Sequence, residues 1–188
     1  MAASDSQEAI LDAVQSVIVR EGVRGASMRQ VAQEADVSLG LLSYHFDDKD
    51  SLIEAAFERA TTELLQASVE AAAAVDDADA KVRAFLRGSF SDDFLDGDYL
   101  RLRISLWAVA ITDEKIAGID ARFYTEYVEE LANLVSIARP DLSAAEVSAG
   151  TTDLIAFSNG LWLDWARFQN ADALERGLAA CEAVALDA

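Results

Sequence analysis

Ser38 to His45 is a short segment whose side chains could contact the bases and phosphates of DNA. With helical spacing, Leu41 and Leu42 partly face a small core, and the other positions are left for a partner. An α-helix fits the major groove, where each base pair presents a distinct pattern of donors, acceptors and methyl groups. The candidate groove contacts are Leu39, Gly40, Ser43, Tyr44 and His45.

Three of these residues offer different kinds of contact. Gly40 would let the backbone approach DNA closely, because it has no side chain. Leu39 could touch a thymine methyl group, and Ser43 could bond a base edge or a phosphate. We expect Phe46, which follows the segment, to fill the core instead of contacting DNA.

The residues before this segment could bind the phosphate backbone. Arg29 could hold the flanking backbone, and Ser27 with Gln30 forms a Ser-x-x-Gln arrangement typical of a helix start. Ser38 can cap the next helix, and only a tight turn at 35–37 separates the two. Because helix starts present free backbone N–H groups, Ser27 and Ser38 are further candidates for phosphate contacts.

Catalytic and metal chemistry find little support in the sequence. It contains one histidine, one cysteine and no Glu-x-x-His motif. A multi-histidine metal site is excluded, and a catalytic dyad would need another base. We therefore predict no metal, no cofactor and no enzymatic activity, and we interpret Cys181 as a small buried hydrophobic residue.

Composition favours an all-α fold, but the charge opposes DNA binding. The 188 residues are 52% hydrophobic with one Pro and nine Gly, and the net charge is −19. Residues 1–46 carry 3 basic and 6 acidic residues, net −3, whereas 47–188 carry 12 and 28, net −16. Acid farther from DNA than about 8 Å is largely screened at physiological salt, so the charge does not exclude a DNA-binding surface. An adaptation to solubility or to high salt is the alternative explanation.

No segment predicts export or membrane insertion. The uncharged runs at 104–112 and 154–163 are far shorter than the roughly 18 to 20 apolar residues of a membrane span. The first ten residues hold acids where a signal peptide has basic residues. We expect a cytoplasmic protein that does not bind a membrane.

Hydrophobic spacing and capping signals predict about nine helices. Apolar residues from Ile10 to Ile18 form one helix face, and this helix should end near Gly22. A Ser143-to-Glu146 capping box starts another helix, and Thr112 is the expected cap between two others. The remaining helices are expected at about 27–35, 38–45, 48–75, between the acidic breaks at 76–79 and 96–98, and at about 98–111, 113–138, 143–168 and 171–187.

The stretch from Ser27 to Leu52 resembles the N-terminal signature of TetR-family regulators, including its Tyr-His-Phe-x-x-Lys-x-x-Leu element at 44–52. This resemblance implies that Tyr44, His45 and Lys49 contact phosphates; for His45 a place in the core or on the surface stays open. Asp36 stands where the family's turn commonly has Gly, and Asp tolerates left-handed backbone better than most residues.

Residues 101–107 and 153–163 are similar to the C-terminal domain of the subgroup that includes the choline-responsive repressor of betaine synthesis. The resemblance implies a helix-turn-helix DNA-binding domain at 1–47 and a helical ligand-binding and dimerisation domain at 48–188, with the helix at about 48–75 as connector. It also implies a dimeric repressor that binds palindromic double-stranded operator DNA and is released by an unidentified small-molecule effector.

Two further sets of residues follow from this domain plan. Aromatic residues could line an effector pocket between helices, although such residues at helical spacing are more often core. The candidates for the pocket are Phe85, Phe90, Phe94, Trp107, Phe123, Tyr124, Tyr127 and Trp162. The last two helices could form a four-helix interface with a second copy, and some of their residues must also serve the core. The candidates for this interface are Leu154, Ile155, Phe157, Leu161, Trp162, Trp165, Leu174 and Leu178.

Two other functions compete with the regulator. A helical carrier of small molecules would use the same C-terminal pocket without selecting a DNA sequence. A helical-bundle enzyme would need a metal or nucleophile constellation, which the sequence does not offer.

Overall fold

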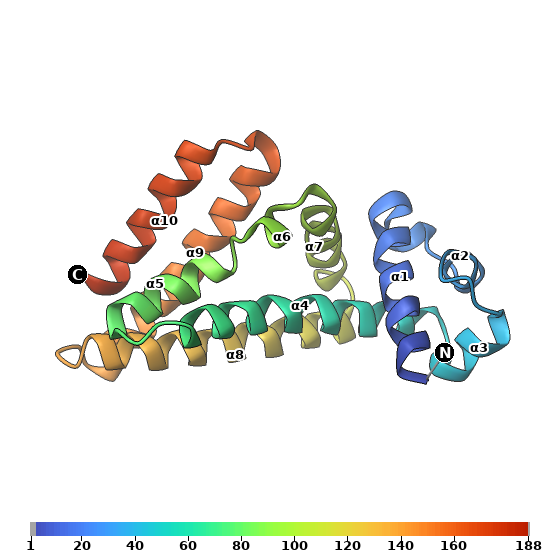
Figure 1. Ribbon diagram of the computed structural model, residues 1–188, viewed down its shortest axis with the longest axis horizontal. Helices are drawn as coiled ribbons and strands as arrows, with labels where there is room; N and C mark the ends of the chain where they lie inside the picture. The colour runs from blue at the N-terminus through green and yellow to red at the C-terminus, as the bar shows by residue number, and fades with distance from the viewer. Residues whose placement is uncertain (1–2, 188) are drawn as a thin grey trace. The chain divides into compact units, whose positions relative to one another are not determined.

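The computed structural model describes residues 3–187, and within them all regular secondary structure is helical, as predicted. These residues form ten helices (Figure 1), one more than expected, because a single turn, α6, precedes α7. None of the helices in this range is long and apolar enough to cross a membrane. The helices are α1 Ala3–Gly25, α2 Met28–Glu34, α3 Leu39–His45, α4 Lys49–Ala73, α5 Ala78–Gly88, α6 Asp92–Leu95, α7 Gly97–Ala110, α8 Glu114–Ala138, α9 Ala144–Phe168 and α10 Ala171–Leu186.

The chain divides into two compact units. The first contains the residues up to Thr62 together with Arg101–Ala121, and the second contains Glu63–Leu100 and the residues from Arg122 onward. The long helices α4 and α8 contribute residues to both units. The first unit therefore includes more chain than the 1–47 segment expected to contact DNA.

The first unit begins with the amphipathic helix expected from the sequence. Ile10, Val14, Val17 and Ile18 are buried on one face of α1. The regular helix is interrupted at Gly22, whose φ of 75° lies in the region that glycine adopts readily. The predicted end of this helix is thus confirmed.

The turn between α2 and α3 uses the left-handed conformation expected at Asp36. Its φ is 52°, and only Asp36 and Gln169 combine a side chain with a positive φ within residues 3–187. Ala35 N–H donates to the Val31 carbonyl at 2.9 Å, and Val37 N–H donates to the Ala32 carbonyl at 3.0 Å. These bonds close the turn and fix the direction in which α3 leaves α2.

The caps of α2, α3 and α9 follow the sequence, but that of α8 does not. Ser27 and Ser38 accept hydrogen bonds from the backbone N–H groups of Gln30 and Leu41. The capping box from Ser143 to Glu146 is complete.

At α8 the expected cap, Thr112, is wrong. Its hydroxyl donates back to the Val109 carbonyl at 3.3 Å. The carboxylate of Asp113 instead accepts from the N–H groups of Lys115 and Ile116, at 3.0 and 3.1 Å. Because a carboxylate can accept two N–H bonds at a helix start, the residue one position later takes the role.

The second unit packs the later part of α4, α5, the later part of α8, α9 and α10 around two apolar clusters. At Gly88 of α5 an added Cβ would lie 2.8 Å from the Cα of Ser68 in α4, so the two helices touch through their backbones. Ser68 and Ser89 share a hydrogen bond of 2.9 Å beside this contact, and Ser89 and Tyr127 share one of 2.7 Å. All three hydroxyl-bearing residues are buried.

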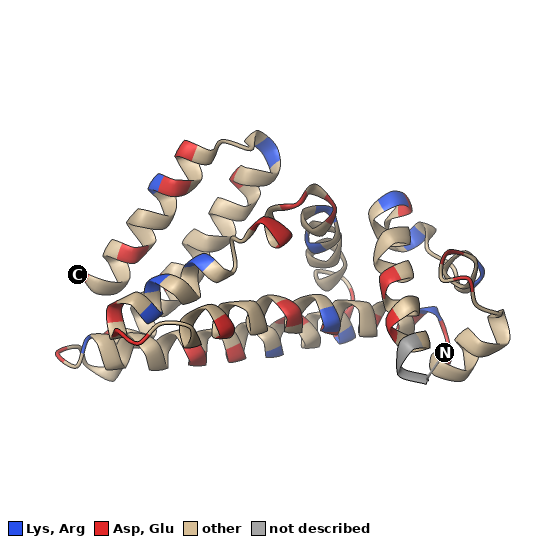
Figure 2. Ribbon diagram, viewed as in Figure 1, with Lys and Arg blue, Asp and Glu red and all other residues tan. Residues whose placement is uncertain are grey.

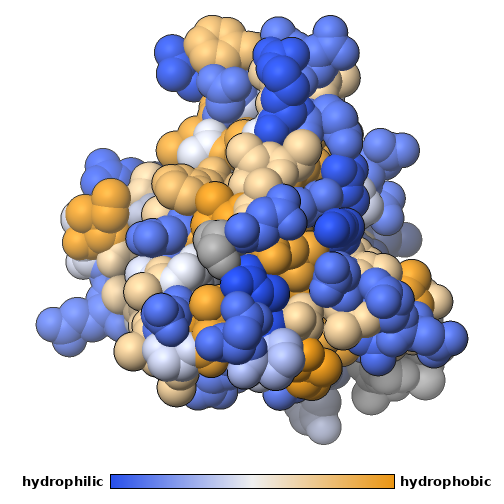
Figure 3. Space-filling model, turned by 90° about the vertical axis from the view of Figure 1, so that its left-hand side faces the viewer, coloured by the Kyte–Doolittle hydropathy of each residue, from blue (hydrophilic) through white to orange (hydrophobic). Residues whose placement is uncertain are grey.

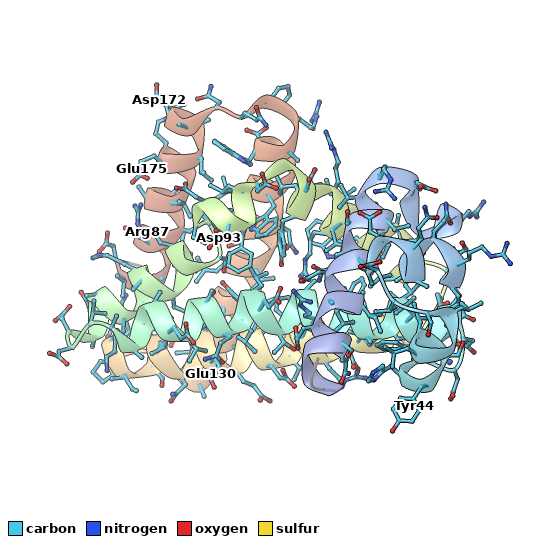
Figure 4. The ribbon with its side chains drawn as sticks, turned by 45° about the vertical axis from the view of Figure 1, so that its right-hand side comes forward. Tyr44, Arg87, Asp93, Glu130, Asp172 and Glu175 are labelled. Carbon is cyan, nitrogen blue, oxygen red and sulfur yellow. The ribbon has the colours of Figure 1, made fainter. Side chains whose placement is uncertain are left out.

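Arg87 connects α5 to α10 by ion pairs. Its guanidinium donates to both carboxylate oxygens of Glu175, at 2.6 and 3.0 Å, and to Glu182 at 2.6 Å; Arg87 and Glu175 are labelled in Figure 4. These bonds raise the pKa of Arg87, the bond to Glu175 contributing most. The hydrogen bond from Arg87 also lowers the pKa of Glu175, so both partners of this pair are charged at neutral pH.

Candidate nucleic-acid interface

The third helix exposes most of the residues predicted to enter the major groove. Leu42 is fully buried and Leu41 is half-buried, so these two anchor α3 as expected. Tyr44 is 81% exposed and Leu39 is 46% exposed, and Figure 4 shows Tyr44 pointing away from the ribbon. Gly40 and Ser43 are exposed beside them. Phe46 is buried, which confirms its place in the core.

His45 differs from the other members of this set. Its ring is half-buried, and its Nε2 atom is buried without a hydrogen-bond partner among residues 3–187. The Tyr44 ring lies edge-on to it, with 5.3 Å between the ring centroids. A phosphate contact through Nε2 does not agree with this burial, which favours the alternative place in the core.

The residues expected to contact the phosphate backbone lie at the ends of the neighbouring helices. Arg29 is exposed on α2. Lys49 begins α4, and its Nζ donates to the Arg24 carbonyl at 3.0 Å, beside the end of α1. The Ser27 hydroxyl is already engaged, because it donates to the Gln30 side chain at 2.6 Å. The same hydroxyl accepts from the Gln30 backbone N–H at 3.3 Å, so the side chain and the backbone of Gln30 both occupy it.

Ion pairs within the first unit reduce the number of cations available to a polyanion. Arg20 of α1 pairs with Glu34 of α2 at 3.1 Å and with Glu21 at 3.3 Å. The hydrogen bond from Arg20 lowers the pKa of Glu34, so this carboxylate stays ionised and cancels the charge of Arg20. A hydrogen bond from the backbone N–H of Ser51 lowers the pKa of Asp48, so this carboxylate also stays ionised.

No charged residue lies on α3 itself, as Figure 2 shows. Within residues 3–187, Arg24, Arg29 and Lys49 are the cations closest in sequence to α3 for which no ion pair with an acidic side chain is found. The interface combines an uncharged reading helix with a small number of flanking cations.

The aromatic residues predicted to line one pocket are dispersed. Phe85 is fully buried against Tyr127, with ring centroids 4.8 Å apart, and the ring centroid of Phe123 lies 5.8 Å from that of Tyr127. Tyr124 is 41% exposed. Trp107 belongs to the first unit, where the Arg103 guanidinium lies 5.4 Å from its ring centroid.

A second aromatic cluster lies at α6 and α9. Phe90, Phe94 and Trp162 are buried in it. Tyr99, which was not among the predicted pocket residues, links them: its ring centroid is 4.9 Å from that of Phe94 and 5.6 Å from that of Trp162. The available signal was an aromatic residue directly after the acidic residues Asp96 and Asp98 at a helix start. Asp93, labelled in Figure 4, is one of the exposed acids of this segment.

Half of the residues predicted for a subunit interface serve the core of the second unit. Leu154, Ile155, Trp162 and Leu178 are buried there. These four are residues of the set that serve the core, as was expected for some of its members.

Three more predicted interface residues are half-buried, and one is exposed. Leu161 and Leu174 pack against the core, and the Trp165 indole N–H donates to the Leu95 carbonyl at 2.9 Å. Phe157 is 50% exposed. The face of the molecule drawn in Figure 3 likewise shows hydrophobic residues at the surface among hydrophilic ones.

Two family descriptions match this chain. Residues 10–56 match "Bacterial regulatory proteins, tetR family", and residues 78–187 match "BetI-type transcriptional repressor, C-terminal". The chain is also similar to the HTH-type transcriptional regulator BetI of Pseudomonas paraeruginosa, at 32% identity over 161 residues, which cover 82% of this chain and 76% of the relative.

Solved structures share the whole fold. A transcriptional regulator from Pseudomonas aeruginosa is 25% identical, with a TM-score of 0.89 over 98% of this chain and 90% of the other. A transcriptional regulator from Saccharomonospora viridis, solved in complex with choline, is 18% identical, with a TM-score of 0.78 over 95% of this chain and 94% of the other. The second likeness concerns the fold alone.

Proposed function

The chain belongs to the TetR family of bacterial regulators and carries a C-terminal domain of the BetI type, and on that premise we propose that it is a repressor released from its operator by a small-molecule effector. As a member of this family it is a transcriptional regulator and not an enzyme. Because it acts on the chromosome, we place it in the cytoplasm.

The observation that carries the proposal is the exposed, uncharged face of α3. We assign the major groove to this helix and the phosphates beside it to the flanking helix ends. Tyr44 and Lys49 are the proposed phosphate contacts, with Arg29 on the backbone of the same half-site. The N-terminal unit, extending through the first part of α4, is the proposed DNA-binding part.

Replacing Tyr44 and Lys49 together with alanine should weaken operator binding and flatten its salt dependence. Each released counterion contributes about five-fold to affinity at 0.15 M salt, so two Lys49 residues per dimer account for about 30-fold. The slope of log affinity against log salt should fall by about 2. Fluorescence anisotropy with operator DNA at several salt concentrations measures both quantities.

Two variants control for this experiment. Lys49→Arg keeps the charge and should keep the slope, whereas Lys81→Ala removes the same charge from α5 and should leave DNA binding unchanged. An unchanged affinity and slope in the double variant would remove Tyr44 and Lys49 from the proposed surface. Circular dichroism checks that the loss of the Lys49 bond to the Arg24 carbonyl has not unfolded the unit.

We further propose that the repressor is a homodimer joined through the outer faces of α9 and α10. The two half-sites of a palindromic operator lie about 34 Å apart, or a multiple of this distance, because DNA repeats once per helical turn. The DNA-binding units of two protomers must therefore be held at a matching distance. Ala156, Phe157, Gly160 and Leu163 are exposed on α9. Exposed Ala179, Ala180, Ala183 and Val184 offer a similar face on α10.

Gly160 supports this face because it lies between the exposed apolar residues Phe157 and Leu163. An added Cβ at this position would meet no atom within 4 Å, so nothing in the protomer requires a glycine there. Glycine inside a helix costs about 1 kcal/mol relative to alanine. A second helix that approaches closely at this point would offset that cost. Gly150 of the same helix is equally open to an added Cβ, but Glu146 and Asp153 stand about one turn before and after it, so Gly150 lies outside the proposed face.

We propose a small organic cation as the effector, bound at the cluster of Phe90, Phe94, Tyr99 and Trp162. Aromatic faces attract quaternary ammonium groups by cation–π interaction, and the acids of the α6 segment add negative potential. The regulator from Saccharomonospora viridis, which has the same fold, was solved in complex with choline. Effector binding would favour a dimer whose two DNA-binding units are at the wrong distance for the operator. By thermodynamic linkage, bound DNA would weaken effector binding by the same factor.

Choline should quench or shift the tryptophan fluorescence and lower operator affinity about 10-fold. The uncharged isostere 3,3-dimethylbutan-1-ol should have no comparable effect, because cation–π attraction needs the charge. Tyr99→Leu should weaken the choline response while leaving operator binding without choline intact. If neither choline nor tetramethylammonium changes the fluorescence or the DNA affinity, the effector is not a cation of this class.

Selection of bound fragments from genomic DNA separates the repressor from a small-molecule carrier. A repressor enriches a palindromic sequence, and a carrier enriches none.

A further inference from the structure

The exposed face of α3, formed by Leu39, Gly40, Ser43 and Tyr44, lacks the side chains that most often recognise bases. Between Val37 and Phe46 the chain contains no Arg, Lys, Asn, Gln, Asp or Glu. Figure 2 shows α3 without a charged residue. The exposed side chains of the helix are those of Leu39, Ser43 and Tyr44, with Gly40 between the first two.

This composition restricts the bases that the helix can read directly. Guanine is recognised in the major groove by Arg or Lys, adenine by the bidentate amide of Asn or Gln, and cytosine by the carboxylate of Asp or Glu. Each of these side chains is absent from α3. Thymine is the base that presents an apolar group, its 5-methyl, and an apolar side chain is its partner.

The surface around Leu39 has room for such a group. Leu39 is 46% exposed although it lies on a helix whose Leu42 is fully buried. At the neighbouring Gly40, an added Cβ would meet only the Ser38 Oγ atom, at 3.9 Å. No side chain at position 40 therefore separates Leu39 from a methyl group that projects into the groove.

We propose that the operator half-site is read through thymine methyl groups, with Leu39 as the specificity-determining contact. This inference rests on the proposed DNA-binding function of α3. Burial of one methyl group is worth about a four-fold change in affinity. A symmetric operator, which has one such contact in each half-site, should therefore lose about 15-fold when both methyl groups are removed.

The test begins with the full-length protein and random duplex DNA. The selected operator is resynthesised with uracil in place of each symmetric pair of thymines, which removes the methyl groups and keeps the base pairs. Anisotropy should show a loss of about 15-fold at one pair of positions and little change elsewhere. At that pair, 5-methylcytosine should bind more tightly than cytosine by a similar ratio.

Leu39→Ala then assigns the effect to the side chain. The variant should bind the thymine operator about 15-fold more weakly and should no longer distinguish thymine from uracil. Ile111→Ala is the matched control, because Ile111 is an aliphatic residue of the first unit that is 84% exposed outside α3. It should retain the full distinction.

The outcomes separate this inference from the proposed function. Tight binding of a selected operator with no sensitivity to uracil at any position overturns the thymine readout and leaves the repressor intact. Sensitivity to uracil that persists in Leu39→Ala overturns the assignment to Leu39. Failure to select any sequence overturns the proposed function itself.

Discussion

Gly160→Arg is expected to convert the dimer into monomers and to lower operator affinity about 100-fold or more. The substitution places a long charged side chain where a Cβ has open space in the protomer, so the fold should tolerate it. A partner helix approaching at this point would be blocked. With one DNA-binding unit per particle, the second half-site no longer benefits from the high effective concentration that linkage provides.

Light scattering and DNA binding check this prediction together. The wild-type mass should be twice 20.3 kDa, and the variant mass should be close to 20.3 kDa. Gly150→Arg is the control, because it makes the same change in the same helix at another position where no atom lies within 4 Å of an added Cβ. A Gly160→Arg protein that stays dimeric and binds its operator normally would place the subunit interface elsewhere.

Phe85→Ala is expected to lower the free energy of unfolding by about 3–5 kcal/mol. Phe85 is fully buried, and its ring packs 4.8 Å from that of Tyr127 in the larger core cluster. Truncation leaves a cavity in addition to the lost transfer free energy, which explains the size of the effect. Urea denaturation followed by circular dichroism measures it.

The same variant decides between core and pocket for Phe85. A residue lining an effector pocket would change ligand affinity at a small cost in stability. Tyr124→Ala, at a 41% exposed position on the neighbouring α8, should cost no more than about 0.5 kcal/mol. If Phe85→Ala lowers the free energy of unfolding by less than about 1 kcal/mol, Phe85 is better explained as a residue that lines a pocket.

Local signals in the sequence predicted most of the fold. The left-handed turn at Asp36 and the capping box at Ser143 depend on residues a few positions apart, so the sequence holds all the participants. The exposure of Leu39 and Tyr44 followed from the burial of Leu42 and the helical period. The cap of α8 was misassigned because Thr112 and Asp113 are both competent caps, and geometry selects between them.

Tertiary neighbours decided the rest of the candidate site. The period of α9 identifies its apolar residues but not whether Leu154 or Phe157 faces the chain's own core, since apolar residues lie on several sides of this helix. Aromatic spacing equally could not separate Phe85 from Phe90 into two clusters. The ion pair between Arg20 and Glu34 likewise joins two helices, and no local pattern in the sequence indicates it.

The contact between Gly88 and Ser68 limits how the second unit can rearrange. Sliding of α4 along α5 would drive Gly88 into the next α4 side chains and would pull Ser68 away from Ser89, whose bond lies in a buried site. A tilt of one helix over the other keeps both the backbone contact and the hydroxyl pair. The crossing therefore acts as a pivot. Within this unit α4 can rotate about its contact with α5, but it cannot slide along α5.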